Sequence, residues 1–79
     1  MGATEEECSA LVSDLRKNVR DCVFQVEPDF DEEGAFYIVV VSHMYVRHDL
    51  TRLLPPEWRA SEWRNPDQRA EICVIAKVG

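Results

Sequence analysis

The strongest constraint on the fold is an unbroken apolar segment of strand-forming residues, Ala35-Phe36-Tyr37-Ile38-Val39-Val40-Val41. A strand with one face in water alternates apolar and polar residues, whereas an unbroken run is typical of a strand that is covered on both faces or central in its sheet. The chain has 79 residues, which leaves no room for a second core. We therefore predict one compact domain, residues 1–79, built around this strand.

A helix is predicted near the start of the chain. Thr4-Glu5-Glu6-Glu7 has the pattern of a capping box, in which the Thr4 hydroxyl accepts a hydrogen bond from the third helical amide and the Glu7 carboxylate accepts one from the cap amide. After Asp21 the spacing of apolar residues changes from that of a helix to that of a strand, so we expect the helix to end before this point. Apolar residues at spacings of three and four form a single stripe on it, namely Cys8, Leu11, Val12, Leu15 and Val19.

A hairpin is predicted next. Residues 22–27 are rich in strand formers and place Phe24 and Val26 on one face. Residues 28–34 contain Pro, Asp and Gly, which are turn residues. We therefore expect a tight connection between this strand and the apolar run at 35–41.

The last part of the chain predicts a turn, a helix and a strand. Asp49 is expected to cap a short turn over residues 50–54. Pro55-Pro56 interrupts what precedes it and suits the start of a new helix, which we place at Glu57 to Arg64. The stretch Ala70 to Val78 alternates as a strand does.

The resulting fold class is α+β with the order α-β-β-α-β. The simplest packing is a small, three-stranded, mainly antiparallel sheet with both helices on one face. This order is similar to the minimal core of the type II KH-like and BolA-like folds, and Tyr37-Ile-Val-Val-Val-Ser42 looks like the central BolA strand. The G-x-x-G loop of KH domains and the F-x-G turn of BolA proteins are missing from the sequence. The resemblance therefore implies an architecture and no transferred site.

No pattern in the sequence predicts a cofactor, a metal site or catalysis. Asp29-x-Asp31-x-Glu33 resembles the first half of a calcium loop, but the twelfth position falls on Val40. His43 and His48 are five residues apart, which suits a chelating pair on neither a strand nor a helix. The cysteines have no C-x-x-C spacing, and we expect reduced, partly buried thiols at Cys8, Cys22 and Cys73.

The charge distribution favours a protein partner. Residues 1–34 carry ten acids and three bases, a net charge of −7, whereas residues 35–79 carry five acids and six bases, a net charge of +1. The acidic half repels nucleic acid and attracts basic protein surfaces. No apolar run approaches the roughly 18 residues of a membrane span, and the first residues do not form a signal peptide, so we expect a cytoplasmic protein that binds no membrane.

Two segments are candidate protein-binding sites. The first is the acidic loop, Asp29, Phe30, Asp31, Glu32 and Glu33. The second is Glu57-Trp-Arg-Ala-Ser-Glu-Trp-Arg64, in which Trp58 and Trp63 lie about 140° apart on a helix, so that one tryptophan would be core and the other exposed. Tryptophan and arginine are enriched at binding hot spots, and an exposed Trp63 between Arg59 and Arg64 would be such an anchor. The alternative is that both tryptophans cover the core.

The leading functional hypothesis is a small acidic, non-enzymatic protein-binding module that regulates or inhibits a larger assembly. In size and charge the chain is similar to the inhibitors that phages make against bacterial defence systems, including anti-CRISPR proteins. Its partner would be another protein, with a basic or nucleic-acid-binding surface. One alternative is a KH-like nucleic-acid binder that uses the C-terminal arginines. A second is a homodimer that pairs edge to edge through Ala70 to Val78.

Overall fold

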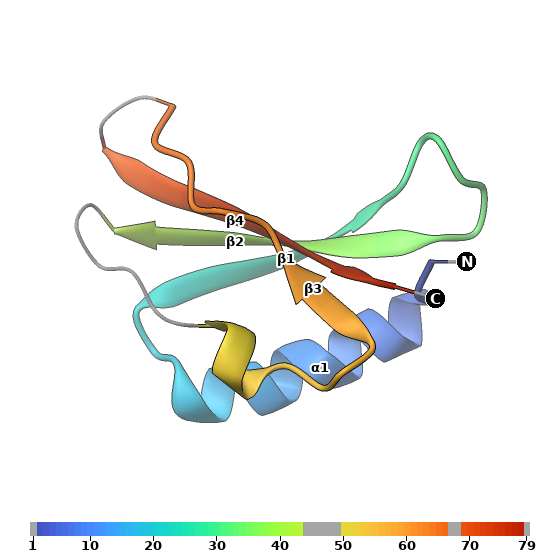
Figure 1. Cartoon of the computed structure of the whole chain (residues 1–79), viewed down its shortest axis with the longest axis horizontal. Coiled ribbons are helices and arrows are strands. Elements are labelled where there is room, and N and C mark those ends of the chain that lie inside the picture. Colours follow the sequence, from blue (N-terminus) through green and yellow to red (C-terminus); the bar gives the residue numbers. More distant parts are fainter. Residues whose placement is uncertain (1, 44–49, 67–68, 79) are drawn as a thin grey trace.

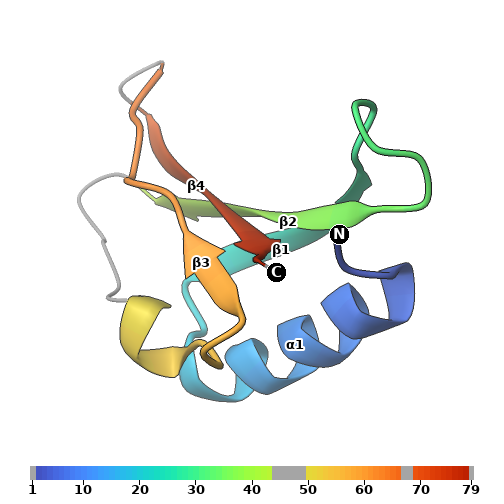
Figure 2. The ribbon, with the colours of Figure 1, turned by 45° about the vertical axis from the view of Figure 1, so that its right-hand side comes forward.

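The computed structural model describes residues 2–43, 50–66 and 69–78. A four-stranded antiparallel sheet has helix α1 on one face, as Figures 1 and 2 show from two directions. The order of strands across the sheet is β1-β2-β4-β3. The α+β class is confirmed. The elements along the chain are α1 (Glu5–Asn18), β1 (Cys22–Pro28), β2 (Phe36–His43), the 3₁₀ helix η1 (Leu50–Leu53), β3 (Trp58–Ala60) and β4 (Ala70–Lys77).

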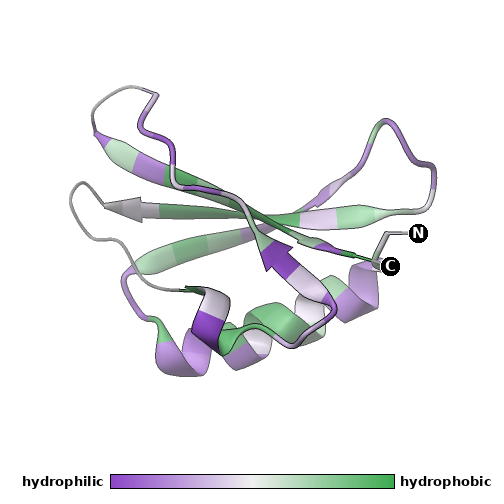
Figure 3. Cartoon of the chain, viewed as in Figure 1, coloured by the Kyte–Doolittle hydropathy of each residue, from purple (hydrophilic) through white to green (hydrophobic). Residues whose placement is uncertain are grey.

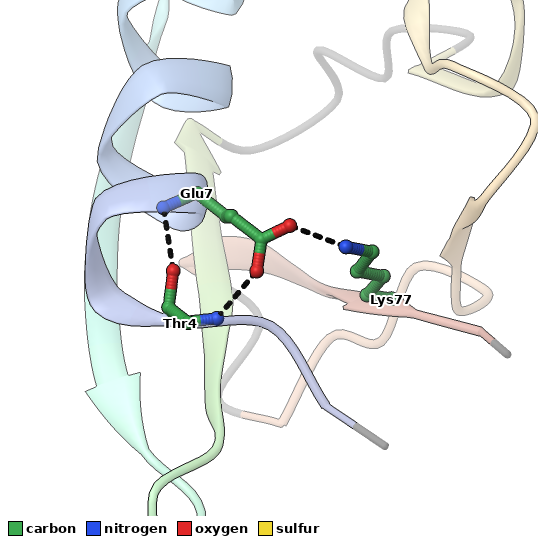
Figure 4. Close-up of polar contacts among 3 residues, drawn as sticks. All are labelled: Thr4, Glu7 and Lys77. Atoms are coloured by element: carbon green, nitrogen blue, oxygen red, sulfur yellow. Dashed lines mark hydrogen bonds and ion pairs between the residues drawn. The ribbon is translucent and has the colours of Figure 1, made fainter.

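Helix α1 begins with the predicted capping box. The Glu7 amide donates to the Thr4 hydroxyl at 3.1 Å, and the Thr4 amide donates to the Glu7 carboxylate at 3.0 Å (Figure 4). The second oxygen of the same carboxylate binds the ammonium group of Lys77 near the end of β4. Glu7 therefore ties the start of the helix to the sheet. The predicted apolar stripe is buried.

The predicted hairpin is also confirmed. Strands β1 and β2 pair in one continuous antiparallel register, with Phe24 opposite Val40 and Val26 opposite Ile38. The Asp29 amide donates to the carbonyl of Ala35 at 2.9 Å and closes the loop. Strand β2 lies between β1 and β4, so the apolar run is central in its sheet as expected.

The helix predicted at Glu57 to Arg64 is wrong. Residues 58–60 form strand β3, and the chain beyond it stays extended along β4, where the amide of Ser61 donates to the carbonyl of Val74 at 2.8 Å. Arg64 and Ile72 exchange both backbone hydrogen bonds at 2.8 and 2.7 Å. The reason is that an isolated helix of two turns has marginal stability, whereas an extended segment forms hydrogen bonds with the backbone groups along β4.

This correction changes the architecture in three ways. The sheet has four strands where three were predicted, and the α-β-β-α-β order behind the similarity to KH-like and BolA-like folds is not the order that the chain adopts. Strand β4 lies between β2 and β3, so it offers no edge for the predicted pairing of two copies through Ala70 to Val78. The short turn at residues 50–54 is confirmed as η1, but its predicted cap, Asp49, lies outside the described residues.

The core fills the space between α1 and the sheet. Its fully buried side chains include Leu15 from the helix and Ile38 and Ile75 from the two central strands. Ile38 and Ile75 face each other across β2 and β4, and Val40 faces Cys73 in the next pair on the same side. One face of the sheet therefore carries the core.

Candidate functional site

The face of the sheet turned away from α1, which we call the outer face, is largely apolar. Side chains alternate along a strand, so the neighbours of the buried Ile38 and Val40 point to the outer face. Paired residues share a face, which gives the rows Val23–Val41–Ile72 and Gln25–Val39–Val74 across three strands. Figure 3 shows apolar residues along β2 and β4.

No described element covers the outer face. Val23 is 58% exposed, and Val39, Val41, Ile72 and Val74 are half-buried. On the opposite side, by contrast, α1 leaves Ile38 and Val40 with no exposed surface. A domain of this size buries its apolar strand residues where it can, so an uncovered row of them marks a surface suited to a partner.

The acidic loop borders one end of the outer face. An open hollow of about 440 Å³ lies there, lined by the outer-face residues Tyr37, Val74 and Ala76 and by Asp29, Phe30 and Asp31 from the loop. The Phe30 side chain is 94% exposed. An apolar depression is thus bordered by two carboxylates and by an accessible aromatic ring.

The acidic loop has a defined conformation. The Asp29 carboxylate accepts a hydrogen bond from the Asp31 amide at 2.9 Å, and Gly34 adopts a φ of 83°, which suits glycine. A carboxylate oxygen of Glu32 accepts from the Gly2 amide at 3.1 Å. Glu33 is exposed. The predicted acidic site is therefore a turn fixed by hydrogen bonds, and its carboxylates lie at one end of the sheet.

Neither tryptophan is placed as an exposed anchor. Trp58 is 6% exposed and packs toward α1, where it lines a hollow with Ala10 and Asp14. Trp63 is half-buried and packs against the core cluster. A partner would have to displace core contacts to reach Trp58, so we do not include it in the candidate surface.

The two arginines of the same segment are exposed. Arg59 pairs with Ala76 and Arg64 with Ile72, which places both at the β3 side of the outer face. The Arg59 guanidinium donates to the carbonyl of Trp58 at 2.9 Å and also to that of Pro56. Of the predicted site residues, Asp29, Phe30 and Asp31 are brought together with outer-face residues, and Arg59 lies in the same cross-strand row as Ala76.

The three cysteine thiols are partly or fully buried. Burial raises the pKa of Cys8, Cys22 and Cys73. The side chain of His43 and the whole of His48 lie outside the described residues. Within the described part of the chain, no group of three or more His, Cys, Asp or Glu side chains is placed to hold a metal ion, and no helix is long and apolar enough to cross a bilayer.

The sequence indicated the acidic loop but missed the outer face. The available signal was the unbroken run at 35–41, which is apolar on both sides of its strand. Comparisons with protein-family models, with curated proteins and with solved structures each found no match. The functional conclusion therefore rests on the geometry of this surface.

Proposed function

We propose that the chain is a small, acidic, non-enzymatic protein-binding module that regulates or inhibits a larger assembly by docking on it through the outer face. One observation carries the proposal. The run at 35–41 has the composition of a strand covered on both sides, yet α1 covers only one side. The second cover is supplied by another protein.

The size of the outer face suits this role. The molecule measures 33 × 25 × 16 Å, and α1 and the sheet stack along the 25 Å dimension (Figure 1), so the outer face covers about 530 Å², the product of the other two dimensions. A standard protein interface takes about 800 Å² from each partner, so the outer face alone supplies about two thirds of one. The whole chain exposes 5641 Å², so such an interface would use about a seventh of its surface.

Charge indicates the kind of partner. The net charge of the chain is −6, and the carboxylates of Asp29 and Asp31 border the apolar hollow. The complementary surface has apolar side chains at its centre and lysine or arginine side chains at one end. Phe30 and Tyr37 are the aromatic anchors that we expect to enter pockets of this partner.

A site-specific crosslinking experiment tests the proposal. A photo-crosslinking amino acid replaces the exposed Phe30 in one variant and the exposed Lys17 on the solvent side of α1 in another. We expect position 30, and not position 17, to capture a partner protein. The purified partner is then titrated with wild type and with the double variant Val39→Thr/Val74→Thr, which keeps β-branched side chains but makes the outer face polar. We expect at least about tenfold weaker binding.

A matched variant separates loss of the surface from loss of the fold. Leu53 is 39% exposed on η1, so Leu53→Thr changes an apolar side chain away from the outer face and should leave affinity unchanged. If the double threonine variant binds as tightly as wild type, the outer face is not the docking surface. A titration with labelled RNA and single-stranded DNA should be flat at low salt, and steep, salt-dependent binding would favour the nucleic-acid alternative instead.

A further inference from the structure

The two edges of the sheet are built differently. At one edge, β3 has three residues, and both outward backbone groups of Trp58 are satisfied: its amide donates to Pro55 at 3.0 Å and its carbonyl accepts from Arg59 at 2.9 Å. At the other edge, β1 has seven residues in unbroken register with β2, and no described residue pairs with its far side. Natural sheets protect such edges with lysine, bulges or covering segments. Strand β1 has none of these over Cys22 to Val26, and its one edge-protecting residue is Pro28 at the C-terminal end.

The free edge of β1 offers a regular set of backbone groups. Asp29 donates to Ala35, so by the alternation of an antiparallel ladder the odd-numbered residues of β1 bond to β2. The amides and carbonyls of Cys22, Phe24 and Val26 therefore point away from the sheet. Pro28, which has no amide hydrogen, occupies the next outward position, as proline does at edges.

This edge is complementary to a second copy of itself. If the seven residues of two β1 strands overlap fully and antiparallel, Gln25 lies opposite Gln25 of the other copy. Phe24 then faces Val26, and Cys22 faces Pro28. This pairing forms about six backbone hydrogen bonds. The result is one continuous sheet with twice the four strands of a single chain, with both helices on the same side.

The flank of α1 beneath this edge has the matching shape. Ala10 and Asp14 face Trp58 on the β3 side, so at 100° per residue the flank toward β1 carries Ser9 and Ser13. Helix α1 contacts both β1 and β2, and with strands about 4.8 Å apart the two helices of a pair would lie about 10 Å from each other. That separation is normal for packed helices, and small side chains at the contact allow it.

The charges along this flank are also self-complementary. Glu5 lies on it at the N-terminal end and Arg16 lies on it in the last turn, and both are exposed. Two helices related by the same two-fold axis run antiparallel, which brings the acidic end of each beside the basic end of the other. The backbone groups of the β1 edge, the small side chains of the α1 flank and the charges on that flank thus all fit a second copy of the chain.

We propose that two copies of the chain form a symmetric dimer along β1, with Gln25 at the two-fold axis and Glu5 of each copy facing Arg16 of the other. This inference concerns a different surface from the outer face and does not depend on the proposed function. Dimerisation joins the two outer faces into one wider face, so a partner would meet a double surface.

Sedimentation equilibrium over a dilution series is the first test. We expect a species of twice the 9.1-kDa chain mass that dissociates on dilution and on addition of salt. Val26→Pro removes an outward amide without touching the ladder to β2, so it should give a folded monomer with unchanged circular dichroism. A single 9.1-kDa species at every soluble concentration of wild type would overturn the proposal.

A charge exchange provides a second test that does not depend on proline. Arg16→Glu alone and Glu5→Lys alone each place like charges opposite one another and should weaken the dimer by about tenfold or more. A mixture of the two variants restores opposite charges at both contacts and should form a heterodimer. Lys17→Glu makes the same charge change on the solvent side of α1, about 100° around the helix axis from Arg16, and should leave the dimer unchanged. A dimer that is insensitive to these changes uses another interface, and the proposal fails.

Discussion

Replacing Trp58 by alanine should remove a large part of the stability of this domain. The indole is 6% exposed in the core cluster. A buried aromatic side chain of this size covers about 150–250 Å². At about 25 cal/mol per Å² this area is worth about 4–6 kcal/mol, and measured losses for Trp→Ala in cores are about 3–5 kcal/mol because neighbours partly close the gap. A domain of this length has a free energy of unfolding of about 4–12 kcal/mol.

Urea unfolding followed by far-ultraviolet circular dichroism measures this loss. We expect Trp58→Ala to lower the free energy of unfolding by about 3–5 kcal/mol. Trp58→Phe keeps most of the apolar surface and should cost about 1–2 kcal/mol. In Trp58→Phe the remaining indole, Trp63, reports on its own surroundings, and its half-buried position should give partial quenching by acrylamide.

An exposed neighbour is the control. Glu62 lies four residues further along the same segment and is exposed, so Glu62→Ala should change stability by no more than about 0.5 kcal/mol. A loss below about 1 kcal/mol for Trp58→Ala, close to that of the control, would mean that the indole is not a core residue. The extended course of residues 58–64, on which its burial depends, would then be wrong as well.

Three further predictions test other contacts. A methyl group on Gly2 would lie 2.5 Å from the side chain of Ala35, so Gly2→Ala should lower the melting temperature, at a cost of about 1–3 kcal/mol. The ammonium group of Lys77, together with the cap amide, lowers the pKa of Glu7, and the carboxylate raises the pKa of Lys77. The stabilisation from this pair should therefore be present at neutral pH, fade below about pH 4 and fade again above about pH 10.5, and urea titrations of Glu7→Gln should lack the acid-side loss. Because burial raises the pKa of Cys22, iodoacetamide should alkylate it slowly at pH 8 but before the two fully buried cysteines, and mass spectrometry showing rapid labelling of all three would contradict the packing.

The elements that could be predicted from sequence are those with local signals. The capping box at Thr4 and Glu7 fixes the start of α1 through hydrogen bonds within one turn of helix. The hairpin follows from the run at 35–41 and the turn residues before it, which are also neighbours in sequence. In both cases the residues that carry the signal are the residues that make the contacts.

The segment at 57–64 could not be assigned in this way. Its Glu, Trp, Arg and Ala residues suit a helix, and Pro56 suits the first helical position. What decides its conformation is the edge of β4, with which Ser61 and Arg64 form hydrogen bonds. Those partners lie eight and thirteen residues further along the chain, and no local pattern reports them.

One part of the candidate site could be predicted from the sequence and the other part could not. The acidic loop was visible in the sequence because its charges are consecutive. The outer face was not, because its residues alternate with core residues along two strands and become one surface only when the register is known. The composition at 35–41 indicated a strand that is covered on both faces or central in its sheet, but not which side the helix would take.

The choice of valine on the outer face argues for contact with a partner more strongly than for strand stability. Threonine has the same β-branched shape and a similar preference for strands, and at a half-exposed position its hydroxyl group can bind water. The fold would therefore be served almost as well by threonine at Val39 and Val74, and solubility would be served better. An apolar side chain at these positions lowers the free energy of the system only when a partner removes it from water. The free energy of unfolding of the isolated chain should thus hardly change on the double threonine substitution that weakens binding.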